Sequence, residues 1–240
     1  MNALKEKAYH LIGNRLFRKP RQLVKRLVVG YIARNNKEIV QFPKEFFDLF
    51  KEVQRETEIL MSAHQAYIVY CTAKAAKKIP GDMLEVGVYK AGSAKLICEV
   101  KGSKNLHLFD TFSGLSDSCE LDVQNDGLRF KKGDFLSDYN TVKNLLSKYS
   151  NVFVNKGVFP ESAKTVLNKK FCFAHIDVDT YASTRDALNF LYERMTKGGS
   201  FLVHDYGTAQ GVTKAVDEFF KDKPETVITV TNKQCLIVKS

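Results

Sequence analysis

Acidic side chains follow two apolar runs in the second half of the chain. Asp177 and Asp179 come directly after one run, and His204 and Asp205 come after the next. Burial of this much negative charge requires a positive partner. A hard divalent cation held by Asp177 and Asp205, with His204 as a third candidate ligand, would supply it, and water and substrate oxygens would complete the coordination. The residue types therefore predict a divalent-metal site.

Helix capping is the other explanation for these polar residues. Asp179 or Ser183 could cap the helix expected to begin near Thr184, and Asp205 could cap a turn. Because four polar groups at two adjacent strand ends exceed what capping needs, we favour the metal site. His175 lies inside its strand, and we expect it to be a core or subunit-contact residue.

A glycine turn lies earlier in the chain, between an expected strand and an expected helix. The turn contains Gly87 and Gly92, and Ser93 follows it. Glycine lets a cofactor approach the backbone closely, and a helix N-terminus offers free N–H groups to a polar or negative ligand. Tyr89 stands where the dinucleotide fingerprint GxGxxG requires its second glycine, which disfavours a pyrophosphate-bearing cofactor.

Two acidic residues near this turn indicate the kind of ligand. Glu85 lies two residues before Gly87. A carboxylate there can pair with the amino group and sulfonium of S-adenosylmethionine. Asp110 ends the second expected strand, where a carboxylate can accept both hydroxyls of a ribose. The turn and the two acids together predict a nucleoside cofactor.

Strand-like and helix-like patterns alternate along most of the chain. Residues 45–78 are helical in pattern, and β-rich runs are expected at 83–88, 106–110, 152–155, 171–178, 200–204, 226–230 and 235–238. Further helices are expected at 93–100, 139–149, 183–196 and 212–220. This alternation predicts an α/β fold with a parallel sheet and helices on both faces. The short connection between the last two runs predicts an antiparallel hairpin.

The N-terminal part differs in composition from the rest. Residues 1–40 contain ten Lys and Arg and two Glu, a net charge of +8 out of +10 for the chain. Residues 41–240 hold the other 27 basic and 25 acidic residues, or +2, so nucleic acid is not an expected partner. We expect 1–40 to form a basic helical arm, 41–80 a helical lid or linker, and 81–240 the domain that carries the motifs. The arm either packs on the body or a second copy, or docks on an anionic membrane or glycan.

Cysteine usage and hydropathy indicate the compartment. The five cysteines form no CxxC pair, and an odd number fits reduced thiols. We find no apolar run of 18 residues and no signal-peptide pattern at the start of the sequence. We expect a cytoplasmic protein, with contact at the inner membrane face through the arm as the alternative.

Taken in order, the motifs resemble the macrocin O-methyltransferase family, metal-dependent enzymes that methylate sugar hydroxyls of macrolide and aminocoumarin antibiotics and related glycans. The matching segments are 79–93, 109–115, 156–162, 176–184 and 203–206, within about residues 61–240. The resemblance implies a Rossmann-like class I methyltransferase sheet of seven strands, with S-adenosylmethionine as methyl donor.

The resemblance also implies roles for individual residues. Cofactor contacts are expected from Met61, Ser62, Glu85, Gly87, Gly92, Ser93, Asp110, Thr111, Gly157, Phe159 and Asp177. Asp179 corresponds to the proposed general base, and Asp177 and Asp205 to metal-binding acids. The family usually shows Asp-Asp where this chain has His204 and Asp205. Imidazole binds Mg²⁺ poorly and Mn, Fe or Zn well, so the metal differs, His204 stands outside the coordination sphere, or metal dependence is weakened.

These observations lead to one principal hypothesis and two alternatives. The chain is expected to be an S-adenosylmethionine-dependent O-methyltransferase that acts on a hydroxyl of a sugar or glycoside, in a secondary metabolite or a surface glycan, with help from a divalent metal. A nicotinamide-dependent sugar oxidoreductase and a non-catalytic glycan-binding module are the alternatives. Self-association of the chain is left open.

Overall fold

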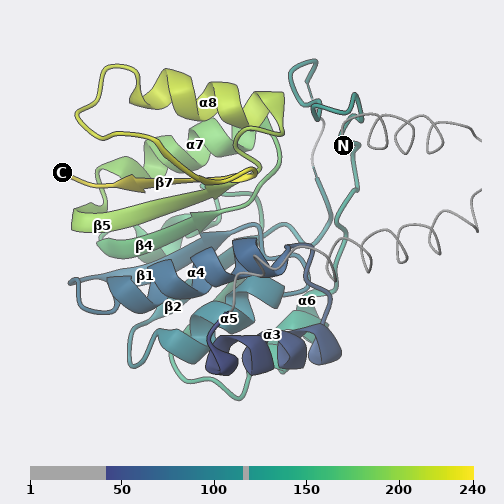
Figure 1. Cartoon of the computed structure of the whole chain (residues 1–240), viewed down its shortest axis with the longest axis vertical. Helices are drawn as coiled ribbons and strands as arrows, with labels where there is room; N and C mark the ends of the chain where they lie inside the picture. Colours follow the sequence, from purple (N-terminus) through teal and green to yellow (C-terminus); the bar gives the residue numbers. More distant parts are fainter. Residues whose placement is uncertain (1–41, 116–118) are drawn as a thin grey trace, which may run out of the picture. The chain divides into compact units, whose positions relative to one another are not determined.

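The computed structural model describes residues 42–115 and 119–240, which form a seven-stranded sheet with helices on both faces (Figure 1). The strands are β1 (Asp82–Val86), β2 (Leu106–Asp110), β3 (Val152–Lys156), β4 (Phe171–Ile176), β5 (Met195–His204), β6 (Ile228–Thr231) and β7 (Gln234–Val238). Their order across the sheet is β3-β2-β1-β4-β5-β7-β6. The first five strands run parallel, and β7 pairs antiparallel with both β5 and β6. The predicted fold class and the closing hairpin are confirmed.

The central strand explains why the sheet needs two layers of helices. All six residues of β4 are buried, as its apolar sequence requires for a strand covered on both faces. Helices α3 (Lys44–Glu56), α4 (Ala63–Ala76) and α5 (Gly92–Val100) cover one face, and α7 (Tyr181–Tyr192) and α8 (Gln210–Phe220) cover the other (Figure 1). Helix α6 (Tyr139–Leu146) packs near β3, and a short 3-10 helix η1 (Ala163–Val166) precedes β4.

Three helix predictions were wrong in their extent, and one of them is the helix predicted over 139–149, which ends at Leu146. The helix predicted over 183–196 ends at Tyr192, because Met195 already begins β5. The helical stretch predicted over 45–78 is two helices, α3 and α4, with a break between them. The break has a local cause: the Oγ of Ser62 accepts the N–H of Gln65, and Oε1 of Gln65 accepts the N–H of Ser62. This reciprocal capping box starts a new helix where hydropathy alone suggests continuity.

Residues Lys44–Ser240 form a single compact unit. Helices α3 and α4, which fall in the predicted lid or linker of 41–80, therefore belong to the same unit as the sheet. The predicted basic arm, residues 1–40, lies outside the described residues. Within 42–115 and 119–240, every helix is too short or too polar to cross a membrane.

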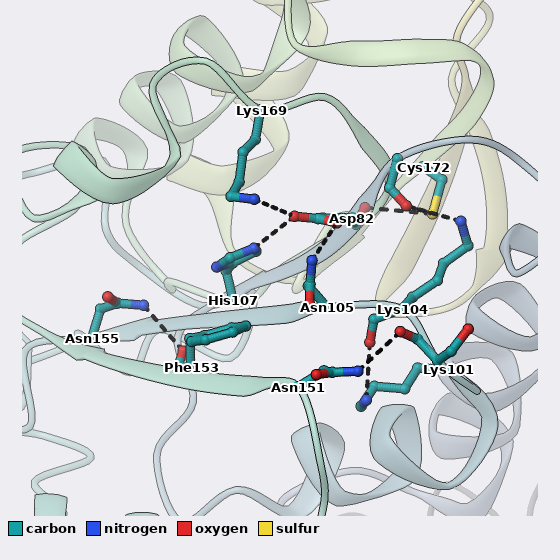
Figure 2. Close-up of polar contacts among 12 residues, drawn as sticks. Asp82, Lys101, Lys104, Asn105, His107, Asn151, Phe153, Asn155, Lys169 and Cys172 are labelled. Atoms are coloured by element: carbon teal, nitrogen blue, oxygen red, sulfur yellow. Dashed lines mark hydrogen bonds and ion pairs between the residues drawn. The ribbon is translucent and has the colours of Figure 1, made fainter.

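A polar cluster joins the strands at their amino-terminal ends (Figure 2). Oδ2 of Asp82, at the start of β1, lies 2.9 Å from Nε2 of His107 on β2 and 3.0 Å from Nζ of Lys169, just before β4. Oδ1 of the same carboxylate accepts a hydrogen bond from Nδ2 of Asn105 at 3.0 Å. Burial raises the pKa of Asp82, but these donors outweigh it and hold the pKa below its usual range. The cluster holds three strands together at the end of the sheet away from the motifs.

Candidate active site

A cavity of about 320 Å³ opens at the carboxyl ends of β1, β2, β4 and β5. The strand order reverses between β1 and β4, and a crevice at such a reversal is where open α/β sheets bind their ligands. Among the predicted site residues, those that line the cavity are Met61, Gly87, Gly92, Ser93, Asp110, Thr111, Gly157, Phe159, Asp177, Asp179, His204 and Asp205. The structure therefore brings together every predicted site residue except Ser62 and Glu85.

The glycine turn between β1 and α5 requires glycine for steric reasons. Gly87 has a φ of +85°, and a Cβ at this position would lie 1.8 Å from the carbonyl oxygen of Asp177. A Cβ at Gly92 would lie 2.6 Å from Cβ of Ile59, which belongs to the break before α4. The turn is therefore packed tightly between the end of β4 and the segment that precedes α4. Met61 in that segment lines the cavity, and its contact with a cofactor stays a prediction.

Asp110 connects the end of β2 to the glycine turn. Its Oδ2 accepts the backbone N–H groups of Val88 and Tyr89, each at 2.8 Å, and its Oδ1 accepts the N–H of Phe112 at 2.7 Å. Each carboxylate oxygen has two acceptor sites, so the group can still accept a ribose hydroxyl from the cavity. The carboxylate thus has a structural task beside the predicted one: it holds the turn in place.

Glu85 occupies a different environment from the one predicted. Its side chain is fully buried and lies outside the cavity lining, and its Oε1 is 2.7 Å from Nδ1 of His175 on β4. Burial raises the pKa of Glu85 against the opposing effect of His175. Its Oε2 has no hydrogen-bond partner among the described residues, and the expected pairing of this carboxylate with the positive charge of a ligand stays a prediction. His175 is buried, as expected of a core histidine.

Three residues at the ends of β4 and β5 form a candidate metal site. Nδ1 of His204 lies 3.1 Å from Oδ1 of Asp177 and 3.0 Å from Oδ2 of Asp205. One donor atom from each residue lies within 4.8 Å of the others. Donors in neighbouring positions around an octahedral ion, each about 2.1 Å from it, are about 3.0 Å apart. The spacing of these atoms fits a shared cation.

His204 supplies a second observation in favour of a bound ligand. Its residue exposure is 7%, yet neither ring nitrogen has a hydrogen-bond partner within 42–115 and 119–240. The two close carboxylate contacts of Nδ1 therefore lack hydrogen-bond geometry. Buried polar atoms are normally hydrogen-bonded, so a buried imidazole that has only ion-pair contacts to two carboxylates fits a ligand that the three donors share. The donor set fits a divalent cation.

The charges of this cluster shift one another's pKa values. Burial lowers the pKa of His204, but the negative charges of Asp177 and Asp205 outweigh it and raise the pKa well above its usual range. Burial, with Asp177 and Asp205 nearby, raises the pKa of Asp179 well above its usual range. Burial would also raise the pKa of Asp205, but His204 and Lys233 keep it low. The pKa of Asp179 is therefore raised where that of Asp205 is lowered, and Asp179 takes up a proton more readily than Asp205.

The capping explanation for these acids is not supported. The N-cap of α7 is Thr180, whose side chain accepts the N–H of Ser183. Helix α8 has no side-chain cap, and Asp205 contributes only its backbone carbonyl, which accepts the N–H of Ala209. Asp179 and Asp205 instead have φ values of +62° and +60°, an uncommon backbone conformation for residues other than glycine. Such residues gather at functional sites, where the surrounding structure holds them in place.

Lys233, which lines the cavity, and Asp122, which lies outside its lining, are among the residues that the sequence reasoning missed. Lys233, in the turn between β6 and β7, lines the cavity with Nζ 3.6 Å from Oδ1 of Asp205. Only the antiparallel return of β7 beside β5 brings it there, and the sequence carries no signal of that proximity. Asp122 is buried and accepts the N–H groups of Tyr181 and Cys119, so it ties residues 119–138 to the start of α7.

A family model described as macrocin-O-methyltransferase (TylF) matches residues 64–233. The chain belongs to the macrocin-O-methyltransferase family. The match contains every predicted site residue except Met61 and Ser62, and it extends to Lys233. The resemblance inferred from the motifs is thereby confirmed.

Curated relatives within this family are similar over part of their length. The chain is 25% identical over 152 residues to mycinamicin III 3''-O-methyltransferase of Micromonospora griseorubida, covering 57% of this chain and 60% of the relative. It is 26% identical over 151 residues to 8-demethyl-8-(2,3-dimethoxy-alpha-L-rhamnosyl)-tetracenomycin-C 4'-O-methyltransferase of Streptomyces olivaceus, covering 57% of this chain and 58% of the relative. The similarity thus spans about three fifths of each relative.

A solved structure shares the fold. The O-methyltransferase NovP superposes with a TM-score of 0.66 at 21% identity, covering 76% of this chain and 82% of NovP. Because the identity is low, this likeness supports the sheet and its helices and nothing finer.

Proposed function

We propose that this chain transfers a methyl group from S-adenosylmethionine to a hydroxyl of a sugar or glycoside, with the assistance of a divalent cation. One observation carries the proposal. The glycine turn and Asp110 line the same cavity as the acids that follow β4 and β5. The side chains proposed to hold the methyl donor therefore line the same cavity as those proposed to bind a cation and accept a proton, as transfer to a hydroxyl requires.

The donor end of the cavity suits the methyl donor. Gly92 and Ser93 line the cavity at the start of α5, where backbone N–H groups lack partners within the helix and favour a carboxylate. Asp110 presents its carboxylate for a ribose, and Gly157 and Phe159 line the wall expected to receive the adenine. S-adenosylmethionine brings its own leaving group, so the protein's main task is alignment.

The acceptor end supplies acid–base chemistry. A divalent cation, when bound, lowers the pKa of a coordinated hydroxyl. Asp177, His204 and Asp205 would hold that cation. Asp179, beside them, would accept the hydroxyl proton as the oxygen attacks the methyl carbon and the carbon–sulfur bond breaks. Its raised pKa suits a group that must take up a proton.

The acceptor is proposed to be a sugar that is part of a larger molecule. The name of the Streptomyces olivaceus relative includes a rhamnosyl group, and this supports a glycoside over a free small alcohol as the acceptor. A sugar of a secondary metabolite and a sugar of a surface glycan fit the proposal equally.

Equilibrium titration tests the donor and the competing oxidoreductase hypothesis together. S-adenosylmethionine should bind to the full chain, and a nicotinamide dinucleotide should not. Tyr89 lines the cavity at a φ of +49° where a pyrophosphate turn would need glycine. Binding of the nicotinamide cofactor alone would reject the proposal, and binding of neither would favour the non-catalytic glycan module. Incubation with labelled donor and host glycans should then yield a product heavier by one methylene group.

A further inference from the structure

The candidate metal site contains a nitrogen donor where a purely oxygen-bearing set would suffice for Mg²⁺. His204 is almost fully buried, and both of its ring nitrogens lack hydrogen-bond partners among the described residues. Its Nδ1 is within 3.1 Å of one oxygen of Asp177 and one of Asp205. An imidazole with only ion-pair contacts to two carboxylates, and no hydrogen bond among the described residues, can serve as a ligand once it has released its proton.

The charge of the site also differs from that of an all-carboxylate cluster. As a metal ligand the imidazole is neutral, so Asp177 and Asp205 supply the negative charge of the donor set. The ammonium of Lys233 lies 3.6 Å from Oδ1 of Asp205, the oxygen that is not in contact with His204. Lys233 therefore offsets part of that charge. Mg²⁺ is commonly held by one or two carboxylates and several waters, so the donor that distinguishes this site is the imidazole and not the number of carboxylates.

The same donor set should bind a transition-metal ion more tightly. Imidazole is a good ligand for Mn, Fe, Co and Zn, and affinity for such sites rises along the first transition row. We propose that this site selects a divalent transition-metal ion over Mg²⁺, and that the nitrogen of His204 is the cause of the selectivity. The inference rests on the proposed cation-assisted function, and it concerns the ion rather than the reaction.

Two substitutions separate the type of donor from the charge. His204→Asp replaces nitrogen with a charged oxygen, and it makes the site more negative by one unit. Lys233→Met also makes the site more negative by one unit, because it removes a cation, but it leaves all three donors in place. Lys233 has a side chain 37% exposed in a hairpin turn, so its substitution should be tolerated. His204→Asn is a third variant, which removes the imidazole nitrogens and leaves the charge of the metal-bound site unchanged.

The experiment measures binding of Mg²⁺ and Mn²⁺ to the full chain after removal of metals with a chelator. In His204→Asp, the ratio of Mn²⁺ to Mg²⁺ affinity should fall by about tenfold or more from its wild-type value. Lys233→Met should raise affinity for both ions together and leave the ratio within about twofold, because both ions carry the same charge. Pulsed electron paramagnetic resonance of bound Mn²⁺ should show coupling to an imidazole ¹⁴N in the wild type and in Lys233→Met, but not in either His204 variant.

Several results would overturn the inference. These are the absence of ¹⁴N coupling in the wild type, an unchanged ratio in His204→Asp and His204→Asn, and a change of ratio in Lys233→Met as large as in His204→Asp. Circular dichroism and binding of S-adenosylmethionine confirm that each variant is folded, and His204→Asn replaces His204→Asp if the latter does not fold.

Failure of this inference is distinguishable from failure of the proposed function. An unchanged ratio of Mn²⁺ to Mg²⁺ affinity in the His204 variants of a chain that still transfers methyl groups would reject the metal selectivity and leave the transferase intact. A chain that binds Mn²⁺ through nitrogen but does not bind S-adenosylmethionine would reject the transferase and leave the metal result in place.

Discussion

Asp110→Asn tests whether the acid at the end of β2 supports the glycine turn as well as a ligand. The carboxylate accepts three backbone N–H groups, two at Oδ2 and one at Oδ1. Asparagine has one acceptor oxygen, so if it keeps the pair from Val88 and Tyr89, its NH₂ group faces the N–H of Phe112. One hydrogen bond to a charged acceptor is then lost, which costs about 1.5–3 kcal/mol of stability, and the other two hydrogen bonds become weaker.

The expected loss is about 2–3 kcal/mol in the free energy of unfolding, because Asp110 is partly exposed and solvent replaces some of what is lost. For a unit of about 200 residues this corresponds to a decrease in Tm of about 4–12 °C. Differential scanning fluorimetry without cofactor measures it. Asp126→Asn is the matched control: Asp126 is exposed and its side chain accepts one N–H, from Leu128 at 3.1 Å.

The same variant is then titrated with S-adenosylmethionine, and we expect affinity to fall by about tenfold or more, since a charged hydrogen bond is worth about that much. A Tm equal to that of the wild type and of Asp126→Asn would refute the structural part of the reasoning, even if affinity fell. Reduced Tm with unchanged affinity would refute the ribose assignment.

Four further predictions follow from the site and its surroundings. Asp179→Asn should lower turnover by about 10²–10⁴-fold, while calorimetry shows S-adenosylmethionine affinity within about threefold of wild type; loss of binding would contradict the base assignment. Gly87→Ala should cost more than about 3 kcal/mol in urea unfolding or prevent folding, because its Cβ would overlap a carbonyl oxygen, whereas Gly127→Ala, at a similar φ with no atom within 4 Å, should cost about 1 kcal/mol. Burial would raise the pKa of Glu225, but hydrogen bonds from donors that include Lys239 and Ser240 lower the pKa to about 2. The contribution of this carboxylate to the free energy of unfolding is therefore complete above the ordinary pKa of 4.5, and it is lost as the pH falls toward 2. The difference in unfolding free energy between wild type and Glu225→Gln should shrink over that range, and a difference independent of pH would argue against the pairing. Deletion of residues 1–40, which lie outside the described residues, should reduce co-sedimentation with anionic vesicles if the arm docks on membranes, and an unchanged pellet would favour a structural or self-association role.

The strand ends were predictable from the sequence because their signals are local. An apolar run followed by acids marks the carboxyl end of a buried parallel strand, and the topology of such sheets brings these ends together without any knowledge of packing. Asp110, Asp177 and Asp205 were therefore placed in one cavity correctly. The break between α3 and α4 was missed, although its signal, Ser62 followed three residues later by Gln65, was present.

The sequence by itself determined the order of strands and helices, the glycine turn and the acids that close the strands, because each depends on neighbours along the chain. Only the tertiary structure decided which side chains meet across strands. It paired Glu85 with His175, since the register of β1 against β4 aligns them. It also placed Lys233 beside Asp205, because the antiparallel return of β7 along β5 carries the preceding turn to the cavity. Contacts of this kind depend on register and on the path of the chain in space, and a sequence pattern records neither.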